Sequence, residues 1–102
     1  MKAALTMISL AAALMAAQAG AATPEDLLKQ NNCLACHAVD AKVVGPSYKQ
    51  VAAKYKGQDV VAKLMDKVKK GGSGSFGPVP MSPNPQVPDA DLKVMVQWIL
   101  TR

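Results

Sequence analysis

The pentapeptide Cys33-Leu34-Ala35-Cys36-His37 constrains the fold of this chain more than any other feature of its sequence. It contains both cysteines and the single histidine among the 102 residues. Two thiols three residues apart lie on one side of a helical turn, and the imidazole that follows them can point to the same side. A group bound here contacts three side chains from one direction, so the rest of the chain must enclose it.

Several kinds of site use cysteines at this spacing. A structural zinc ion needs four ligands, and the pentapeptide supplies three at most. A thioredoxin-like redox pair needs a strand–helix setting, and the sequence has no strand alternation of useful length. A disulfide between Cys33 and Cys36 would close too short a loop to stabilise much chain. The remaining interpretation is C-x-x-C-H as the attachment signature of c-type haem. Both thiols then form thioethers, and His37, unless it is only a surface histidine, binds the iron.

Residues 1–22 are predicted to be a cleaved secretory signal. They combine a single cation, Lys2, with an Ala/Leu/Met run and small residues that offer cleavage positions between 19 and 22. The alternative is a membrane anchor, but the apolar run is shorter than the ~20 residues that a bilayer span needs. This pattern predicts export to the periplasm without stable membrane insertion.

The mature domain, residues 23–102, is short for a self-sufficient hydrophobic core. It contains only four aromatic side chains, and eleven Lys and Arg against seven Asp and Glu give it a formal charge of +4. A haem would fill the centre that the side chains cannot. The modest charge, with no cluster of arginines and aromatics, argues against nucleic-acid binding.

Hydrophobic periodicity predicts an all-α domain of four to five short helices around the haem. Thr23 and Asp59 are the expected N-caps of the first and third helices, and Gly71-Gly72 should end the third. The expected helices run from Pro24 towards Cys33, over 47–55, over 60–70 and over 89–100.

A proline-rich segment, FGPVPMSPNPQVP at 76–88, predicts a long ordered loop that holds Met81. Met65 and Met95 lie on apolar helical stripes, where methionine is usually core filler. Met81 lies on no stripe, and the prolines around it reduce the entropy lost when the loop fixes the sulfur. Because Met paired with His raises the potential of cytochromes c, we expect Met81 to be the second axial iron ligand. A P-x-x-P recognition segment is the alternative.

Together, NNCLACHAVD, VGPSYKQVAAKY, GPVPMSPN and DLKVMVQWIL resemble the small bacterial class I cytochromes c of the c551/c552 (c8) type. The resemblance implies thioethers at Cys33 and Cys36 and axial ligands His37 and Met81. It also implies haem-packing or helix-contact roles at three further positions, Leu64, Val68 and Trp98.

The same resemblance implies two hydrogen bonds around the ligands. The Pro46 carbonyl should accept from the His37 ring, and the Asn84 side chain should donate to the Met81 sulfur. Two departures concern the haem propionates. Phe76 stands where relatives often place a tryptophan and has no N–H to donate. Lys67 stands where relatives carry a propionate-binding arginine and cannot make a bidentate pair.

The resemblance implies a monomeric, non-enzymatic carrier of single electrons in the periplasm. Its redox partners would be proteins such as a quinol-oxidising complex, nitrite reductase or cytochrome oxidase. Two alternatives stay open at this point. One is a ligand sensor or peroxidase from which Met81 dissociates, and the other is a cytochrome subunit of a larger enzyme.

Overall fold

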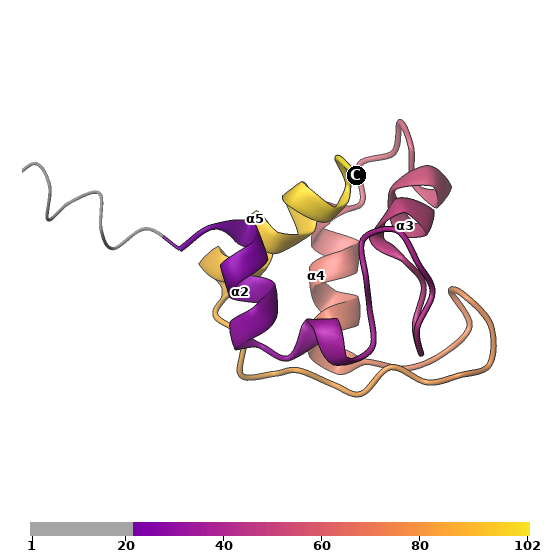
Figure 1. The fold of residues 1–102 in the computed structure, drawn as a ribbon, viewed down its shortest axis with the longest axis horizontal. Coiled ribbons are helices and arrows are strands. Elements are labelled where there is room, and N and C mark those ends of the chain that lie inside the picture. Colours follow the sequence, from indigo (N-terminus) through magenta and orange to yellow (C-terminus); the bar gives the residue numbers. More distant parts are fainter. Residues whose placement is uncertain (1–21) are drawn as a thin grey trace, which may run out of the picture.

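The computed structural model describes residues 22–102, which form four α-helices and one short 3-10 helix without any strand (Figure 1). The elements are α2 (Pro24–Gln30), η1 (Cys33–Ala35), α3 (Tyr48–Lys54), α4 (Val61–Lys70) and α5 (Asp89–Ile99). The predicted all-α class is therefore confirmed. Residues 1–21 of the predicted signal lie outside the described residues. Between 22 and 102, no helix has both the length and the apolar character needed to cross a membrane.

Capping boxes start two of the helices. Thr23 accepts from the backbone N–H of Asp26 at 3.2 Å, and the Asp26 carboxylate accepts from the Thr23 N–H. Ser47 and Gln50 make the same reciprocal pair at the start of α3. Such pairs satisfy N–H groups that a helix leaves unbonded in its first turn. The predicted cap at Thr23 is confirmed.

The predicted cap at Asp59 is wrong. The N-cap of α4 is Val60, which makes no side-chain capping bond. Val60 is buried, whereas Asp59 is exposed. Burial of the valine side chain therefore fixes the start of the helix one residue later than the capping preference suggested. The other end is as predicted, because Gly71 with φ of 69° ends α4.

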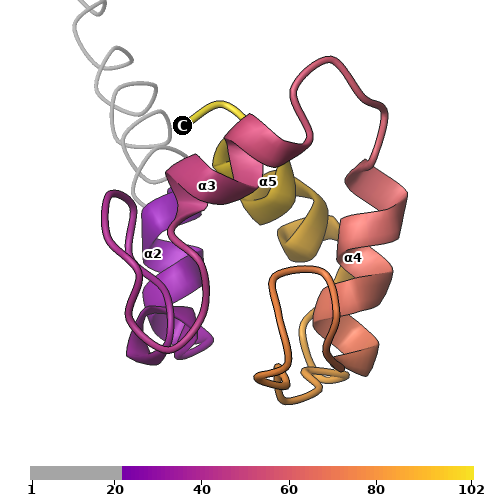
Figure 2. The same ribbon diagram turned by 90° about the vertical axis from the view of Figure 1, so that its right-hand side faces the viewer.

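Helix α5 is the centre of the packing, since it contacts α2, α3 and α4. Its side chains Leu92, Met95 and Val96 are almost fully buried, and Leu28 of α2 packs with them. Met95 is thus core filler, as its place on the apolar stripe predicted. Figure 1 shows α5 passing behind α2, and Figure 2 shows it between α2 and α4.

Helix α4 differs from the other helices because none of its side chains is fully buried. Its apolar residues Val61, Leu64, Met65 and Val68 are only half-buried, although they pack against the core cluster. In Figure 2, α2 with the 33–47 segment forms one arm of the molecule, and α4 with the 71–88 loop forms the other. Helices α3 and α5 connect the two arms. The four apolar residues of α4 lie on the second arm.

Candidate haem site

The cysteine pair lies on a tight turn directly after α2. Asn32 adopts a left-handed conformation with φ of 58°, which ends the first helix and starts the 3-10 turn at Cys33. The backbone N–H groups of Cys36 and His37 both donate to the Cys33 carbonyl, at 3.2 and 3.0 Å. Cys33 is half-buried and burial raises the pKa of its thiol, whereas Cys36 is exposed. The two cysteines and the histidine are therefore held on one short, hydrogen-bonded turn.

The ring of His37 is fixed on two sides. Its Nδ1 lies 2.7 Å from the carbonyl oxygen of Pro46, and because a carbonyl only accepts, Nδ1 carries the proton. Tyr48 stacks on the imidazole with ring centroids 5.4 Å apart and planes 20° apart. Nε2 is then the nitrogen that has a lone pair free to bind a metal. The Pro46 contact is the one that the resemblance implied.

Tyr48 was not identified from the sequence as part of the site. Its ring also meets Trp98 edge-on, with centroids 6.3 Å apart, so an aromatic layer joins the histidine to α5. The Tyr48 hydroxyl is buried and has no hydrogen-bond partner among the described residues. Burial is the main cause that raises the pKa of this hydroxyl. The only sequence signal for Tyr48 was its place just after the Ser47 cap.

Met81 is anchored through its backbone to the end of α4. The N–H groups of Met81 and Gly72 each donate to the other residue's carbonyl, both at 2.9 Å. Three residues later, the Asn84 N–H donates to the Val68 carbonyl at 2.9 Å. The Asn84 side chain donates to the Ser82 carbonyl at 3.0 Å, which stabilises the loop itself. The loop is therefore tied to the C-terminal end of α4 at Met81 itself and again at Asn84.

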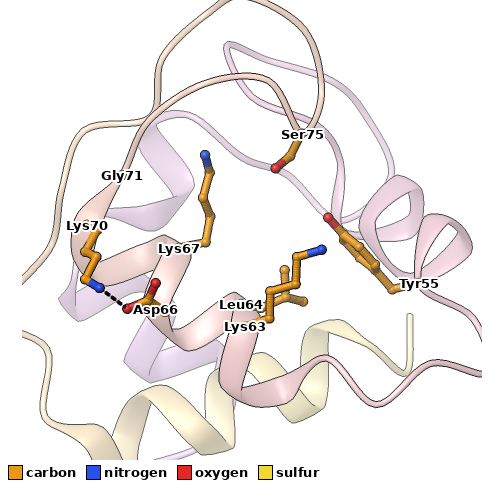
Figure 3. Close-up of a pocket in the computed structure, with 8 residues that line it drawn as sticks. All are labelled: Tyr55, Lys63, Leu64, Asp66, Lys67, Lys70, Gly71 and Ser75. Carbon is orange, nitrogen blue, oxygen red and sulfur yellow. Dashed lines mark ion pairs between the residues drawn. The ribbon is translucent and has the colours of Figure 1, made fainter.

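A cavity of about 280 Å³ opens beside the same end of α4 (Figure 3). The side chains of Lys63 and Lys67 extend from the helix into this space, towards Tyr55 and Ser75. The one carboxylate on its lining, Asp66, pairs with Lys70 at 2.9 Å. Within residues 22–102, neither Lys63 nor Lys67 forms an ion pair. The cavity therefore presents two ammonium groups that no acidic side chain neutralises.

Phe76 lies on the loop above this cavity. Its ring meets Tyr55 edge-on, and the Lys54 ammonium lies 4.5 Å from its centre. Lys54 also donates to the Ser75 carbonyl. Phe76 is 40% exposed, and this contact set holds the loop to α3 without offering any N–H from the aromatic ring.

The residues present fit a haem. Six large apolar side chains are exposed within residues 22–102, and five of them lie on the two segments that carry His37 and Met81 (Leu34, Val43, Val44, Phe76 and Val79). Imidazole nitrogen and thioether sulfur are axial ligands that haem iron accepts. The half-buried stripe of α4 offers the apolar surface that a porphyrin would cover. In contrast, the part of the chain that the structure describes contains no group of three His, Cys, Asp or Glu side chains able to hold a lone metal ion.

Comparison with known proteins identifies the class. The sequence profile of the family described as Cytochrome c matches residues 21–102. The chain therefore belongs to the cytochrome c family, and its cofactor is one covalently bound haem c.

Within that family the chain is of the small bacterial c-551/c-552 type. It is 51% identical to cytochrome c-551 of Azotobacter vinelandii over 80 residues, which are 78% of this chain and 96% of that protein. It is 54% identical to cytochrome c-552 of Nitrosomonas europaea over 77 residues, which are 74% of this chain and 75% of that protein. The crystal structure of wild-type Nitrosomonas europaea cytochrome c552 matches with a TM-score of 0.71 at 52% identity. That match covers 76% of this chain and 96% of the other. The chain is a monohaem class I cytochrome c from a family of electron carriers.

Proposed function

We propose that this cytochrome is a soluble periplasmic carrier of single electrons, with His37 and Met81 as the axial ligands of its haem iron. The observation that carries the proposal is that two iron ligands of different chemistry are fixed independently, on two different segments. Pro46 and Tyr48 hold the His37 ring, and the reciprocal bonds with Gly72 hold the Met81 backbone.

When bound, haem c supplies reversible one-electron chemistry between ferric and ferrous iron. The protein's own residues hold and orient the two ligands. A proton held on Nδ1 by the Pro46 carbonyl keeps Nε2 directed to the metal and raises its basicity. A loop tied to α4 at Gly72 and Val68 returns the methionine to the same place in both oxidation states. With both axial positions taken, no position is left for a substrate, which favours transfer over catalysis.

The lysines of the cavity suit the two carboxylates that a haem carries. Lys63 and Lys67 are unpaired within the described residues, and Tyr55 adds a hydroxyl from the facing helix. We propose that these groups take over the propionate contacts that Phe76 does not provide. Lysine ammonium groups act as point charges here, so the contact is electrostatic rather than bidentate.

Location and partners follow from the amino-terminal segment and the relatives. Residues 1–22 have the pattern of an export signal, which supports a periplasmic location. The partners would be periplasmic or membrane-bound redox proteins, such as a quinol-oxidising complex as donor and nitrite reductase or an oxidase as acceptor.

Replacing Met81 tests the proposal. In the holoprotein, Met81→Leu should abolish the weak red absorption band of iron–methionine bonding, lower the reduction potential and let the ferrous protein bind carbon monoxide. Met95→Leu is the matched control, because Met95 is buried in the protein core on α5 and should leave all three unchanged. If the wild type binds carbon monoxide as readily as Met81→Leu, then Met81 is dissociable and a ligand sensor or peroxidase becomes the better interpretation.

A further inference from the structure

We propose that Gly45 and Gly71 are positioning residues for the two axial ligands, because the lack of a side chain at each sets the place of His37 and of Met81. The inference rests on the proposed ligation. It goes further because it assigns a role to two residues that bind neither iron nor haem.

Gly45 lies against the imidazole. A Cβ at this position would lie 2.5 Å from Cε1 of His37, 3.0 Å from Nδ1 and 3.1 Å from Nε2. Carbon atoms do not pack so closely, so an alanine here requires the ring to move. The φ angle of Gly45 is not in the left-handed region, so its backbone conformation does not itself require glycine. Space for the ring is the only reason for glycine that the structure shows.

Neither Gly45 nor the His37 ring can move easily to relieve this contact. The Gly45 N–H donates to the Cys36 carbonyl at 2.8 Å, which ties it to the same turn that carries the histidine. The imidazole is held by the Pro46 carbonyl at Nδ1 and stacks on Tyr48. A methyl group at Gly45 would therefore act on the Nδ1–H···O=C bond, which sets the donor strength of the ligand.

Gly71 plays the equivalent part for Met81. A Cβ on Gly71 would lie 2.8 Å from the Pro83 nitrogen, 3.0 Å from the Ser82 carbonyl carbon and closer still to the Met81 carbonyl oxygen. All three are backbone atoms, so no side-chain rotation relieves the contact. Because Gly71 is the C-cap of α4, a side chain there would push the 81–83 backbone away from the helix and carry the Met81 sulfur with it.

The other glycines show that these two are special. Of the six glycines in residues 22–102, only Gly45 and Gly71 would place a Cβ within 3.4 Å of another residue, and both contacts involve a ligand residue. Gly57, Gly74 and Gly77 have positive φ and nothing within 4 Å, whereas Gly72 would meet only the end of the Lys67 side chain at 3.4 Å. Gly57, Gly74 and Gly77 therefore provide controls for backbone strain, whereas Gly72 pairs with Met81 through its backbone.

The experiment compares Gly71→Ala, Gly57→Ala and Gly74→Ala as holoproteins. Gly57 and Gly74 have φ of 75° and 104°, so their alanines carry the strain of a positive φ without any contact to the Met81 loop backbone. We expect Gly71→Ala to lose the iron–sulfur band while both controls keep it, with the helical circular dichroism of all three unchanged. If Gly71→Ala keeps the full band, or if the controls lose it equally, the role of Gly71 as a positioning residue is refuted.

Gly45→Ala tests the other ligand without backbone strain, and it decides the matter if Gly71→Ala does not fold. It should keep the iron–sulfur band but raise the reduction potential, because a weakened bond to Pro46 makes the imidazole a poorer donor. An unchanged potential would overturn the inference for His37. Met81→Leu distinguishes a failure of the proposed ligation from a failure of the inference about Gly71. If Met81→Leu keeps the band, the proposed ligation fails. If Met81→Leu loses the band and Gly71→Ala keeps it, the ligation stands and the inference fails.

Discussion

Preventing haem attachment should unfold this protein. The half-buried apolar stripe of α4, which the haem would cover, gives the size of the stability loss. The perturbation is the double variant Cys33→Ala/Cys36→Ala, which removes both thioether positions. Four apolar side chains, Val61, Leu64, Met65 and Val68, are half-buried in the protein chain taken alone.

Burying an apolar side chain of this size completely contributes roughly 1.5–3 kcal/mol. At most about a third of each of the four residues is still exposed, so covering them with the haem contributes at most about 2–4 kcal/mol in total. Domains are stable by only about 5–15 kcal/mol, and one this small lies near the lower end. The haem-free chain should therefore lose most of its stability.

The assay is urea unfolding followed by far-ultraviolet circular dichroism, with the holoprotein as the reference. We expect the holoprotein to unfold in one cooperative step and the double variant to show weak helical signal without a transition. A haem-free chain that unfolds cooperatively at the same urea concentration as the holoprotein would refute the reasoning, since the side chains alone would then form a sufficient core.

Three further predictions concern single side chains. Burial raises the pKa of Tyr48 above its ordinary value of 10.0, so the folded state favours the protonated hydroxyl and loses stability as the pH rises beyond 10. Relative to Tyr48→Phe, the wild type should therefore lose about 1.4 kcal/mol of unfolding free energy per pH unit above pH 10. A difference in unfolding free energy between the two proteins that stays constant from pH 8 to 11.5 would contradict this. Lys67→Gln should lower the reduction potential by the equivalent of roughly 0.2–1 kcal/mol, measured by protein-film voltammetry, whereas Lys29→Gln on the exposed end of α2 should not. Leu28→Ala should cost about 2–5 kcal/mol of unfolding free energy, because Leu28 is 2% exposed, while Val94→Ala on α5, at 41% exposure, serves as the mild control in the same denaturation experiment.

Local sequence signals predicted the helices well. Thr23 with Pro24 indicated the start of α2, and Gly71 indicated the end of α4, because caps depend on residues that are close in the chain. Asp59 misled because a buried neighbour, Val60, decided the helix start. Capping preferences of about 1 kcal/mol give way when side-chain burial competes with them.

The surroundings of the ligands were less predictable. The motif indicated His37, but the stacking of Tyr48 depends on how the 38–47 segment folds back. Likewise, Gly71 read only as a helix end, and its contact with the Met81 backbone spans ten residues of loop. Nothing in the sequence distinguishes Lys63 from the other lysines of its helix, and only the structure places it at the cavity. Each of these roles depends on tertiary proximity, which periodicity and spacing do not contain.

In the proposed ligation, the imidazole of His37 and the thioether of Met81 hold the iron of the attached haem from opposite sides. X-ray absorption at the iron edge of the purified oxidised holoprotein identifies the atoms that bind the iron. One sulfur neighbour beside the nitrogens of the porphyrin and the histidine is the expected result. An iron shell of nitrogen and oxygen alone would rule out Met81 as a ligand.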